Sequence, residues 1–286
     1  MQIRDITVTH PERVIYPEAG LTKLDLVRYY DVVGEWMLPH LRRRPLTLKQ
    51  CAPDAARCRY MRHSGEHRAP AQVRVVNIRE KTKIGDYMIV DDLSALIALA
   101  QRNIVEFHTW NSTDDRIEQP NRIIFDLDPG PAVAWREMVE AARFVRKALQ
   151  GLRLESWLKT TGGKGLHVVV PIAPAHDWSV CLAFARSFAA ELATYDPNRF
   201  TTKFSKTGRD TLILLDYLRN NRTNTSVAAY SARARPNATV SVPIAWDELT
   251  PRLNPERWTI TTLPRRLKTL KDPWAGYFKK KQSLPL

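Results

Sequence analysis

The segment IIFDLDPG, residues 123–130, constrains the fold and chemistry of this chain more than any other. Its apolar start has the composition of a buried strand, and Pro129-Gly130 ends the strand because proline lacks a backbone donor and glycine permits a turn. Side chains alternate along a strand, so Asp126 and Asp128 share one face, about 6 to 7 Å apart. Two carboxylates at that spacing repel each other, which favours a divalent cation beside them. The alternative is a strand-end turn in which Asp126 caps a backbone amide.

A third carboxylate follows the next apolar segment of this type. Residues 212–215, LILL, are predicted to form a strand, and Asp216 ends it. A basic loop, KFSKTGR at residues 203–209, precedes this strand. A site with two cations requires more carboxylates than a site with one, so Asp216 strengthens the metal interpretation of Asp126 and Asp128.

A glycine-rich segment, TTGGKG at residues 160–165, joins two predicted strands at residues 156–159 and 166–170. Such a turn exposes backbone amides and lets an anion approach closely, and Lys164 adds a charged donor. The segment therefore could hold a phosphate. It lacks the spacing of the nucleotide-hydrolase loop and no helix follows it, so a simple hairpin turn is the alternative.

The charge of the chain indicates an anionic partner. Lysine and arginine number 44 against 30 aspartate and glutamate residues, which gives a formal charge of +14 and an isoelectric point near 9.9. Nucleic acid fits better than a membrane because no apolar segment approaches the roughly 18 to 20 residues of a spanning helix, and the first residues lack a signal core. The basic segment 57–68, around Tyr60, could contact phosphates and stack on a base, or could be a solvated loop.

The three cysteines predict a reducing cytoplasm without structural disulfides, because they are few and odd in number. Zinc ligands are one alternative, formed by Cys51, Cys58, His63 and His67. The six residues separating the two cysteines exceed the usual two to four, so a basic loop is preferred.

Regular patterns predict several helices and strands around these motifs. Thr22 and Asp25 read as a capping pair that opens a helix whose buried stripe includes Leu26 and Tyr30. A strand at residues 104–108 places Glu106 and His108 on one face, where a lone histidine is more often structural than catalytic. Further helices are expected over residues 94–101, 132–150, ended by Gly151, and 178–194, capped by Asp177. No internal repeat, linker or clean domain boundary is visible.

Four motifs in this order resemble the polymerase domain of bacterial DNA ligase D, in the archaeo-eukaryotic primase-polymerase superfamily. They are FDLDPG (125–130), KTTGGKGLH (159–167), DYLRN (216–220) and YSARA (230–234). The resemblance implies an α/β fold with mixed and antiparallel sheets around a central active-site cleft and with outer helices. It also implies a single catalytic domain over residues 1–286, with DNA-end contacts from about 1–110 and the catalytic core at about 111–250.

The resemblance also implies roles for particular residues. The catalytic metal-binding residues would be Asp126, Asp128 and Asp216. The nucleotide-binding residues would be Thr161, Gly162, Gly163, Lys164, His167, Lys206, Arg209 and His108. The DNA-binding residues would be Arg13, Lys23, Lys49, Tyr60 and Arg219, with Arg13 and Lys23 at a 5′-phosphate. The chain departs from the family at Thr161, where many members have serine, at Arg13, where some have lysine, and at residues 59–61, which lack paired phenylalanines.

By the same resemblance, the expected function is template-directed primer extension and gap filling at 5′-phosphorylated DNA ends, in double-strand break repair by non-homologous end joining. The expected cofactors are two ions of Mn²⁺ or Mg²⁺, with a nucleoside triphosphate as substrate. Ku and a DNA ligase are the expected partners, in the cytoplasm at the nucleoid. Two alternatives remain: a non-catalytic DNA-end binding module, and a haloacid-dehalogenase-type phosphatase, which usually has Thr or Val where this chain has Gly130. A Mn²⁺-dependent glycosyltransferase is weaker, because it too leaves the basic charge unexplained.

Overall fold

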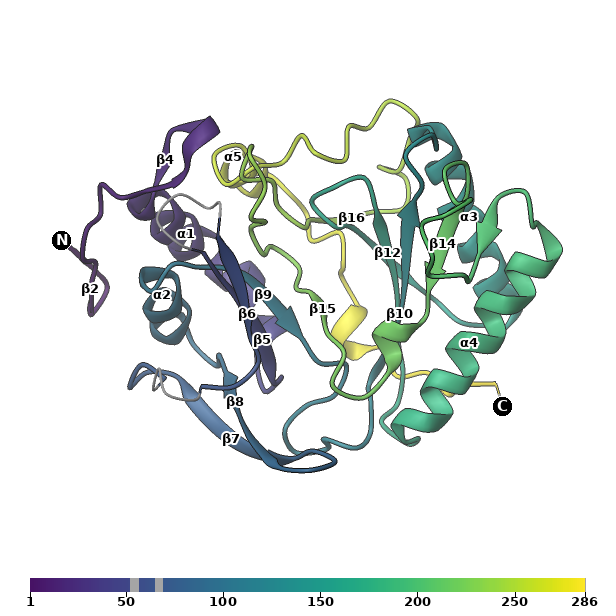
Figure 1. Ribbon diagram of the computed structural model, residues 1–286, viewed down its shortest axis with the longest axis horizontal. Coiled ribbons are helices and arrows are strands. Elements are labelled where there is room, and N and C mark those ends of the chain that lie inside the picture. The colour runs from purple at the N-terminus through teal and green to yellow at the C-terminus, as the bar shows by residue number, and fades with distance from the viewer. Residues whose placement is uncertain (52–56, 65–68, 286) are drawn as a thin grey trace. The chain divides into compact units, whose positions relative to one another are not determined.

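The computed structural model describes residues 1–51, 57–64 and 69–285 (Figure 1). The chain divides into two compact units, and each is described by itself. The first unit comprises Met1–Asp115, Thr225–Ser241 and Glu256–Leu270, and the second comprises Arg116–Asn224, Val242–Pro255 and Lys271–Leu286. The chain passes from one unit to the other several times, which is why composition shows no single boundary.

The second unit is built on a six-stranded sheet with strand order β13-β14-β10-β12-β11-β16. Every pairing is antiparallel except that of β13 with β14, so the sheet is mixed. Its strands are β10 (Arg122–Pro129), β11 (Trp157–Thr160), β12 (Leu166–Pro171), β13 (Phe200–Thr201), β14 (Ile213–Asp216) and β16 (Pro243–Ile244).

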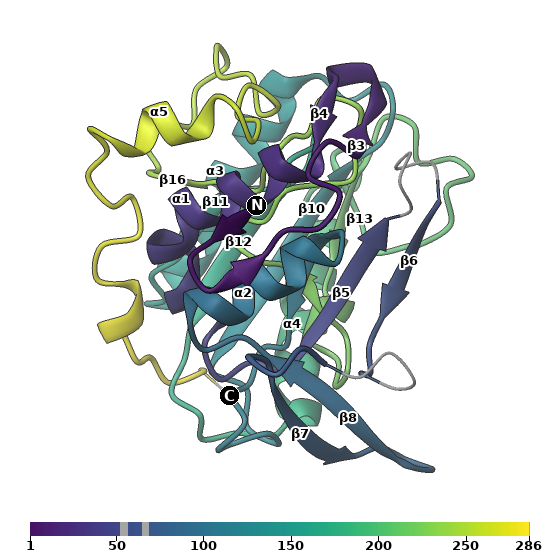
Figure 2. The ribbon, with the colours of Figure 1, turned by 90° about the vertical axis from the view of Figure 1, so that its left-hand side faces the viewer.

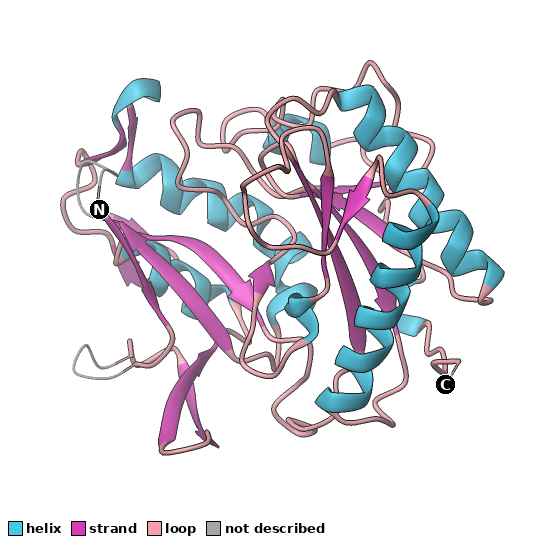
Figure 3. Ribbon diagram, turned by 45° about the vertical axis from the view of Figure 1, so that its right-hand side comes forward, coloured by secondary structure: helices cyan, strands magenta, loops and turns pink. Residues whose placement is uncertain are grey.

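Two long helices, α3 (Trp135–Gly151) and α4 (Trp178–Tyr195), lie against this sheet (Figure 3). The ring of Phe125 on β10 packs against Phe188 of α4, with centroids 4.7 Å apart. The preceding side chain, Ile124, points to the opposite face and packs with Val169, Trp274 and Tyr277. Alternation along β10 therefore places Asp126 and Asp128 on the Ile124 face, opposite the side that α4 covers.

The first unit contains a four-stranded antiparallel sheet with strand order β15-β9-β5-β6. Its strands are β5 (Leu46–Cys51), β6 (Cys58–Met61), β9 (Ile104–Thr109) and β15 (Ser226–Val227). Among the described residues, further strand pairs lie outside this sheet: β1 (Gln2–Ile3) with β2 (Ile6–Thr7), β3 (Val14–Tyr16) with β4 (Leu21–Thr22), and β7 (Arg74–Arg79) with β8 (Ile84–Ile89). The last pair forms a long ribbon (Figure 2).

Helices α1 (Lys23–Leu41), α2 (Leu93–Gln101) and α5 (Leu263–Leu267) complete the first unit, and α1 contacts both of the others. Tyr30 connects α1 to β9 of the four-stranded sheet. Its hydroxyl donates to the carbonyl of Val105 at 2.6 Å, and its ring meets Phe107 at 5.1 Å.

The predicted capping signals are confirmed. Thr22 Oγ1 accepts from the Asp25 amide at 3.3 Å, and the Asp25 carboxylate accepts from the Thr22 amide at 2.8 Å. Asp177 likewise caps α4. The predicted start of α3 at residue 132 is wrong, because the Ala132 amide donates to the Asp210 carbonyl and helical geometry begins only at Trp135. The predicted stop is also displaced, since Gly151 is still helical.

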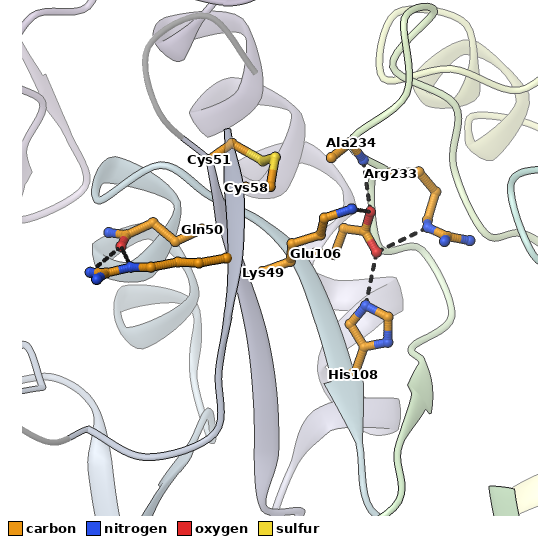
Figure 4. Close-up of a disulfide and its surroundings, with 9 residues drawn as sticks. Lys49, Gln50, Cys51, Cys58, Glu106, His108, Arg233 and Ala234 are labelled. Atoms are coloured by element: carbon orange, nitrogen blue, oxygen red, sulfur yellow. Dashed lines mark hydrogen bonds and ion pairs between the residues drawn. A yellow bond between two sulfur atoms is a disulfide. The ribbon is translucent and has the colours of Figure 1, made fainter. Parts of the chain in front are cut away.

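The prediction of a chain without disulfides is wrong. Cys51 on β5 lies directly opposite Cys58 on β6, and their sulfurs are joined (Figure 4). An antiparallel register brings opposed side chains together, which a count of cysteines cannot reveal. With both thiols joined, neither is available to zinc; His67, the fourth ligand of that alternative, and Arg68 lie outside the described residues. Cys181 is free and buried.

Candidate active site

The three predicted aspartates lie on neighbouring strands of the second unit. Asp126 on β10 is the register partner of Asp216 on β14, and Asp128 is two residues further along β10. Opposed residues of an antiparallel pair point to the same face, as do residues two apart on one strand. The predicted set Asp126, Asp128 and Asp216 therefore shares one face of the sheet.

The same register extends into a row of polar side chains across four strands. Asp126 is opposite His167 on β12, and His167 is opposite Lys159 on β11. His167 Nε2 lies 3.4 Å from Asp126 Oδ1. The row therefore runs Asp216, Asp126, His167 and Lys159, with acidic groups at one end and a buried lysine at the other.

Arginine side chains hold the carboxylates. Arg219 reaches Asp126 Oδ2 through Nε at 3.1 Å and Asp216 Oδ2 through Nη2 at 3.0 Å. Arg209 reaches Asp128 Oδ2 at 3.2 Å. Arg219 was predicted to contact DNA and Arg209 to contact the nucleotide; in this structure both bind the aspartates.

Arg219 is positioned by its neighbour in the 3₁₀ turn Leu218–Asn220. The side chain of Asn220 accepts from the Ile124 amide and donates to the Ile124 carbonyl, both at 2.8 Å. These two hydrogen bonds fix the turn to β10 at a position two residues from Asp126. Asp216 Oδ1 also accepts from the Leu218 amide at 2.8 Å, which closes the turn from its other end.

The pKa values of two of the three aspartates are raised, chiefly by burial. Burial raises the pKa of Asp216, and the nearby Asp126 raises it further, against the opposing charge of Arg219. Burial and Asp126 likewise raise the pKa of Asp128, against Arg209. Burial acts to raise the pKa of Asp126 too, but contact with His167 and the charges of Arg219 and Lys159 outweigh it and hold that pKa below its ordinary value.

His167 is held neutral at neutral pH. Burial, followed by the charge of Lys159, lowers the pKa of His167 to about 4, although Asp126 opposes the shift. Its Nδ1 is buried and has no hydrogen-bond partner within the described part of the chain. The triphosphate contact of His167 remains a prediction, and the structure places this ring against Asp126.

The basic loop approaches β10 because residue 130 is glycine. A Cβ at Gly130 would lie 2.1 Å from the Arg209 carbonyl oxygen and 2.4 Å from that of Asp210. The amides of Gly130 and Ala132 donate to Leu212 and Asp210 at 2.9 Å, which ties the two segments together. This close approach brings Arg209 within reach of Asp128. Lys206, in the same loop, is exposed.

The glycine-rich segment is a hairpin turn between β11 and β12. Thr160 pairs with Leu166, and both the amide and the hydroxyl of Thr161 donate to the Gly165 carbonyl. Gly162 has φ +74°, a conformation that favours glycine. The segment therefore forms a hairpin turn, which is compatible with both interpretations of the sequence.

This turn adjoins the carboxylates. A Cβ at Gly165 would lie 2.9 Å from the Leu127 carbonyl oxygen, so the turn sits against β10 beside Asp128. Gly163 is buried and Lys164 is exposed. Phosphate binding by this turn remains a prediction, now with a location next to the aspartates.

The carboxylates fit a divalent cation in chemistry, although not in their present arrangement. Carboxylate oxygens are the ligands that Mg²⁺ and Mn²⁺ take, and the raised pKa values of Asp128 and Asp216 show that added positive charge would be favourable. Across the described residues, no three His, Cys, Asp or Glu side chains are arranged to hold a metal ion. Arg219 bridges Asp126 and Asp216 instead.

In the first unit, Arg13 and Lys23 line one surface cavity of about 450 Å³. The Lys23 amide donates to the Arg13 carbonyl at 2.7 Å, so the two residues are adjacent although ten positions apart. Lys23 Nζ donates to the Gln101 side chain at 3.0 Å, and burial followed by the charge of Arg13 lowers the Lys23 pKa. Two cationic side chains at one cavity form a suitable site for an anion.

The other predicted DNA contacts cluster on β5 and β6. Lys49 is the register partner of Tyr60, with its Nζ 5.4 Å from the ring centroid. The Tyr60 ring, 60% exposed, meets the His108 ring edge-on at 5.6 Å. His108 is nearly buried and lies 2.8 Å from Glu106, as the shared face on β9 predicted.

Sequence reasoning missed four members of these clusters. They are Lys159, Asn220, Arg233 and, as a partner of His108 and Lys49, Glu106. Lys159, Asn220 and Arg233 lie inside recognised motifs, and Glu106 lies on the predicted strand at residues 104–108, so these patterns were the available signal. Strand register and buried polar contacts give them their roles, and these are not visible in the sequence.

A mixed α/β fold that presents three strand-borne aspartates beside a glycine-rich turn and basic loops is consistent with a nucleotidyltransferase. The family model described as "LigD, primase-polymerase domain" matches residues 22–274. The chain belongs to this family of DNA-directed nucleotidyltransferases. The predicted family and fold are thereby confirmed.

Individual proteins agree with this assignment. The multifunctional non-homologous end joining protein LigD of Pseudomonas aeruginosa is 35% identical over 95% of this chain, and that of Mycolicibacterium smegmatis is 32% identical over 85%. The chain spans 33% and 32% of the length of these relatives. The solved polymerase domain from Mycobacterium tuberculosis ligase D in complex with DNA has a TM-score of 0.85 and 27% identity, covering 92% of this chain and 94% of that chain.

The helices in the described part of the chain are too short or too polar to cross a membrane.

Proposed function

We propose that this chain extends primer strands and fills gaps at 5′-phosphorylated DNA ends during non-homologous end joining. The single observation that carries the proposal is the register of β10 and β14, which places Asp126, Asp128 and Asp216 on one face of the sheet. The likeness to a polymerase domain solved in complex with DNA supports a DNA template. The net charge of +14 supports binding to an anionic polymer.

In this proposal the three aspartates hold two divalent cations, Mn²⁺ or Mg²⁺. When bound, such cations polarise the α-phosphate and stabilise the attacking and leaving oxygens of an in-line displacement. Arg219 neutralises Asp126 and Asp216 in this structure, and these two carboxylates would hold cations only once Arg219 has moved away. Arg209 neutralises Asp128 in the same way, and its guanidinium would then be within reach of the triphosphate.

The nucleotide is held by the glycine-rich turn and the basic loop. Lys164 and Lys206 are exposed cations that bind the phosphates. The Thr161 hydroxyl, which donates to the Gly165 carbonyl in this structure, turns to the phosphates together with the backbone of Gly162 and Gly163. His167, neutral and fixed against Asp126, orients that carboxylate. His108 is assigned to the nucleotide from the family resemblance.

DNA contacts are proposed in the first unit. Arg13 and Lys23 bind the 5′-phosphate in the cavity that they line. Lys49 contacts the phosphate backbone and the exposed ring of Tyr60 stacks on a base. Ku and a DNA ligase are the proposed partners, in the bacterial cytoplasm.

The test is incorporation of ATP or dATP on a gapped duplex with a 5′-phosphate, in Mg²⁺ or Mn²⁺. We expect incorporation that requires the cation and is stronger with the 5′-phosphate than with a 5′-hydroxyl. A non-catalytic end-binding module would bind the duplex and incorporate nothing. Release of phosphate from a monoester without incorporation would support the phosphatase alternative.

Asp128→Ala should abolish incorporation while leaving duplex binding within about twofold, because this carboxylate lies outside the proposed DNA contacts. Asp247→Ala, an exposed aspartate of the same unit, serves as the matched control and should behave as the wild type. Retained incorporation by the Asp128 variant would reject the metal assignment.

A further inference from the structure

Glu106 is a buried carboxylate with a donor group on every side (Figure 4). Its Oε2 accepts from His108 Nε2 at 2.8 Å and from Arg233 Nε at 3.1 Å. Its Oε1 accepts from the Ala234 amide at 2.9 Å and lies 3.3 Å from Lys49 Nζ. The residue is only 1% exposed, so these contacts replace water completely.

These four contacts make Glu106 an ionised residue despite its burial. A carboxylate has about four acceptor positions, and here each oxygen receives two donors. Burial acts to raise the pKa of Glu106, but the hydrogen bond from His108 and the charge of Arg233 outweigh it and hold the pKa below its ordinary range. Glu106 therefore carries its negative charge throughout the physiological range.

The donors come from segments that are distant in sequence. Lys49 lies on β5, His108 on β9, and Arg233 in the segment Thr225–Ser241. That segment has its own anchors on the same unit: Ser231 Oγ accepts from the Phe107 amide at 2.9 Å, and the Ala232 amide donates to the Tyr30 hydroxyl at 3.1 Å. The backbone is thus held independently, and Glu106 acts on the side chains.

The geometry at His108 gives the contact a specific consequence. An ionised carboxylate accepts only, so Nε2 must carry a proton and donate it to Glu106. This fixes the ring orientation and places Nδ1 on the opposite edge of the ring. An Nε contact likewise fixes the plane of the Arg233 guanidinium.

We infer that Glu106 is a positioning residue that holds His108 in the orientation in which it binds the incoming nucleoside triphosphate. The inference rests on the proposed function, which assigns His108 to the nucleotide. It adds one residue that the assignment did not contain, Glu106, which acts through His108. Glu106 itself touches neither nucleotide nor DNA.

A purely structural role would make a different use of the same residue. A buried ion pair is often no more stabilising than apolar side chains of the same volume, so stability alone does not require a charge here. A positioning role requires the charge, because only an ionised acceptor selects one tautomer of His108 and one orientation of Arg233. The two roles separate in nucleotide kinetics.

The experiment compares Glu106→Gln with the wild type in single-nucleotide incorporation on the gapped duplex. We expect KM for the nucleotide to rise roughly tenfold to a hundredfold, the effect of weakening one hydrogen bond to a charged group, with kcat changed by less than about threefold. Affinity for the duplex should change less than KM, because Lys49 is the one proposed DNA contact that the structure pairs with Glu106 in its described residues. Glu106→Asp keeps the charge and should recover part of the loss in KM.

Asp114→Asn is the matched control. Asp114 is a mostly buried carboxylate of the same unit that pairs with Arg43 and Arg74, and it has no proposed contact with nucleotide or DNA. It should keep the wild-type KM. Thermal unfolding of every variant shows whether each is folded at the assay temperature, and Glu106→Asp carries the test if Glu106→Gln is not.

A double-mutant cycle with His108→Ala shows whether Glu106 acts through the histidine. If it does, Glu106→Gln raises KM by less than about threefold in the His108→Ala background. An unchanged KM in Glu106→Gln, or an equal increase with and without His108, would overturn the inference while leaving the proposed function intact. A wild type that incorporates no nucleotide would overturn both.

Discussion

Three clustered aspartates in the second unit and a single buried glutamate in the first unit differ in how well nearby positive groups neutralise their charge. In the second unit, Asp126, Asp128 and Asp216 share one sheet face, and burial with mutual repulsion raises the pKa of two of them. In the first unit, Glu106 is surrounded by donors and its pKa is lowered. The negative charge of the aspartates is therefore only partly neutralised, whereas that of Glu106 is fully neutralised.

The difference separates residues that bind a ligand from residues that position others. A carboxylate cluster that gains from added positive charge is suited to bind cations, and the contacts of Arg219 and Arg209 are of a kind that a metal ion can replace. A saturated carboxylate such as Glu106 gains nothing from a further cation. Its role is to fix the groups that donate to it.

Removing one charge from the aspartate cluster should have the largest effect. Asp216→Asn keeps the shape of the side chain but weakens cation binding, so we expect nucleotide incorporation to fall by about a thousandfold, several kcal/mol of transition-state stabilisation. Quench-flow measurement of single-nucleotide incorporation would detect this loss. A decrease of less than tenfold would place the catalytic cations elsewhere.

Replacing a carboxylate by its amide should change the free energy of unfolding in opposite directions at Asp216 and at Glu106. In the absence of divalent cations, Asp216→Asn should raise the free energy of unfolding by about 0.5 to 1 kcal/mol, because it removes an unfavourable buried charge. Glu106→Gln should lower it by about 3 kcal/mol, because it leaves buried cationic partners without a counter-charge. Urea unfolding in EDTA measures both.

The pH dependence gives the sign of each contribution. The folded-state pKa of Asp216 is raised, so its charge destabilises the protein above that pKa, and the penalty disappears as the pH falls through it. The folded-state pKa of Glu106 is lowered, so its stabilisation is complete above the ordinary glutamate pKa and is lost as the pH falls toward the folded value. If Asp216→Asn and Glu106→Gln changed the free energy of unfolding in the same direction, the proposed difference between the two sites would be wrong.

A smaller effect on nucleotide incorporation is expected at Gly130, where close backbone packing brings Arg209 to Asp128. Gly130→Ala introduces a Cβ that collides with the Arg209 and Asp210 carbonyls, so the basic loop must move and incorporation should fall roughly tenfold. Gly151→Ala is the matched control, since a Cβ there meets no described atom within 4 Å. It should leave incorporation unchanged and add about 0.5 kcal/mol to the free energy of unfolding.

Local features of the fold were predictable from the sequence. The alternation that places Asp126 and Asp128 on one face, the strand exit at Asp216 and the cap at Thr22 follow from residues close together in the chain. The hairpin after residue 160 was one of two stated interpretations. These features depend on local backbone geometry, which sequence patterns encode directly.

The features that were missed depend on register across distant segments. That Asp126 faces Asp216 on one side and His167 on the other, or that Cys51 faces Cys58, is set by how strands align, which the pattern of any one strand does not specify. The contacts of Arg219 were missed for the same reason. The late start of α3 reflects a bond from the Ala132 amide to the distant loop at Asp210.

The central claim is that Asp126, Asp128 and Asp216 together bind divalent cations. Its most direct test is anomalous diffraction at the manganese edge, from crystals grown with Mn²⁺ and a non-hydrolysable nucleoside triphosphate. We expect manganese in contact with all three carboxylates and Arg219 displaced from Asp126 and Asp216. Manganese bound elsewhere, with Arg219 still bridging the two aspartates, would contradict it.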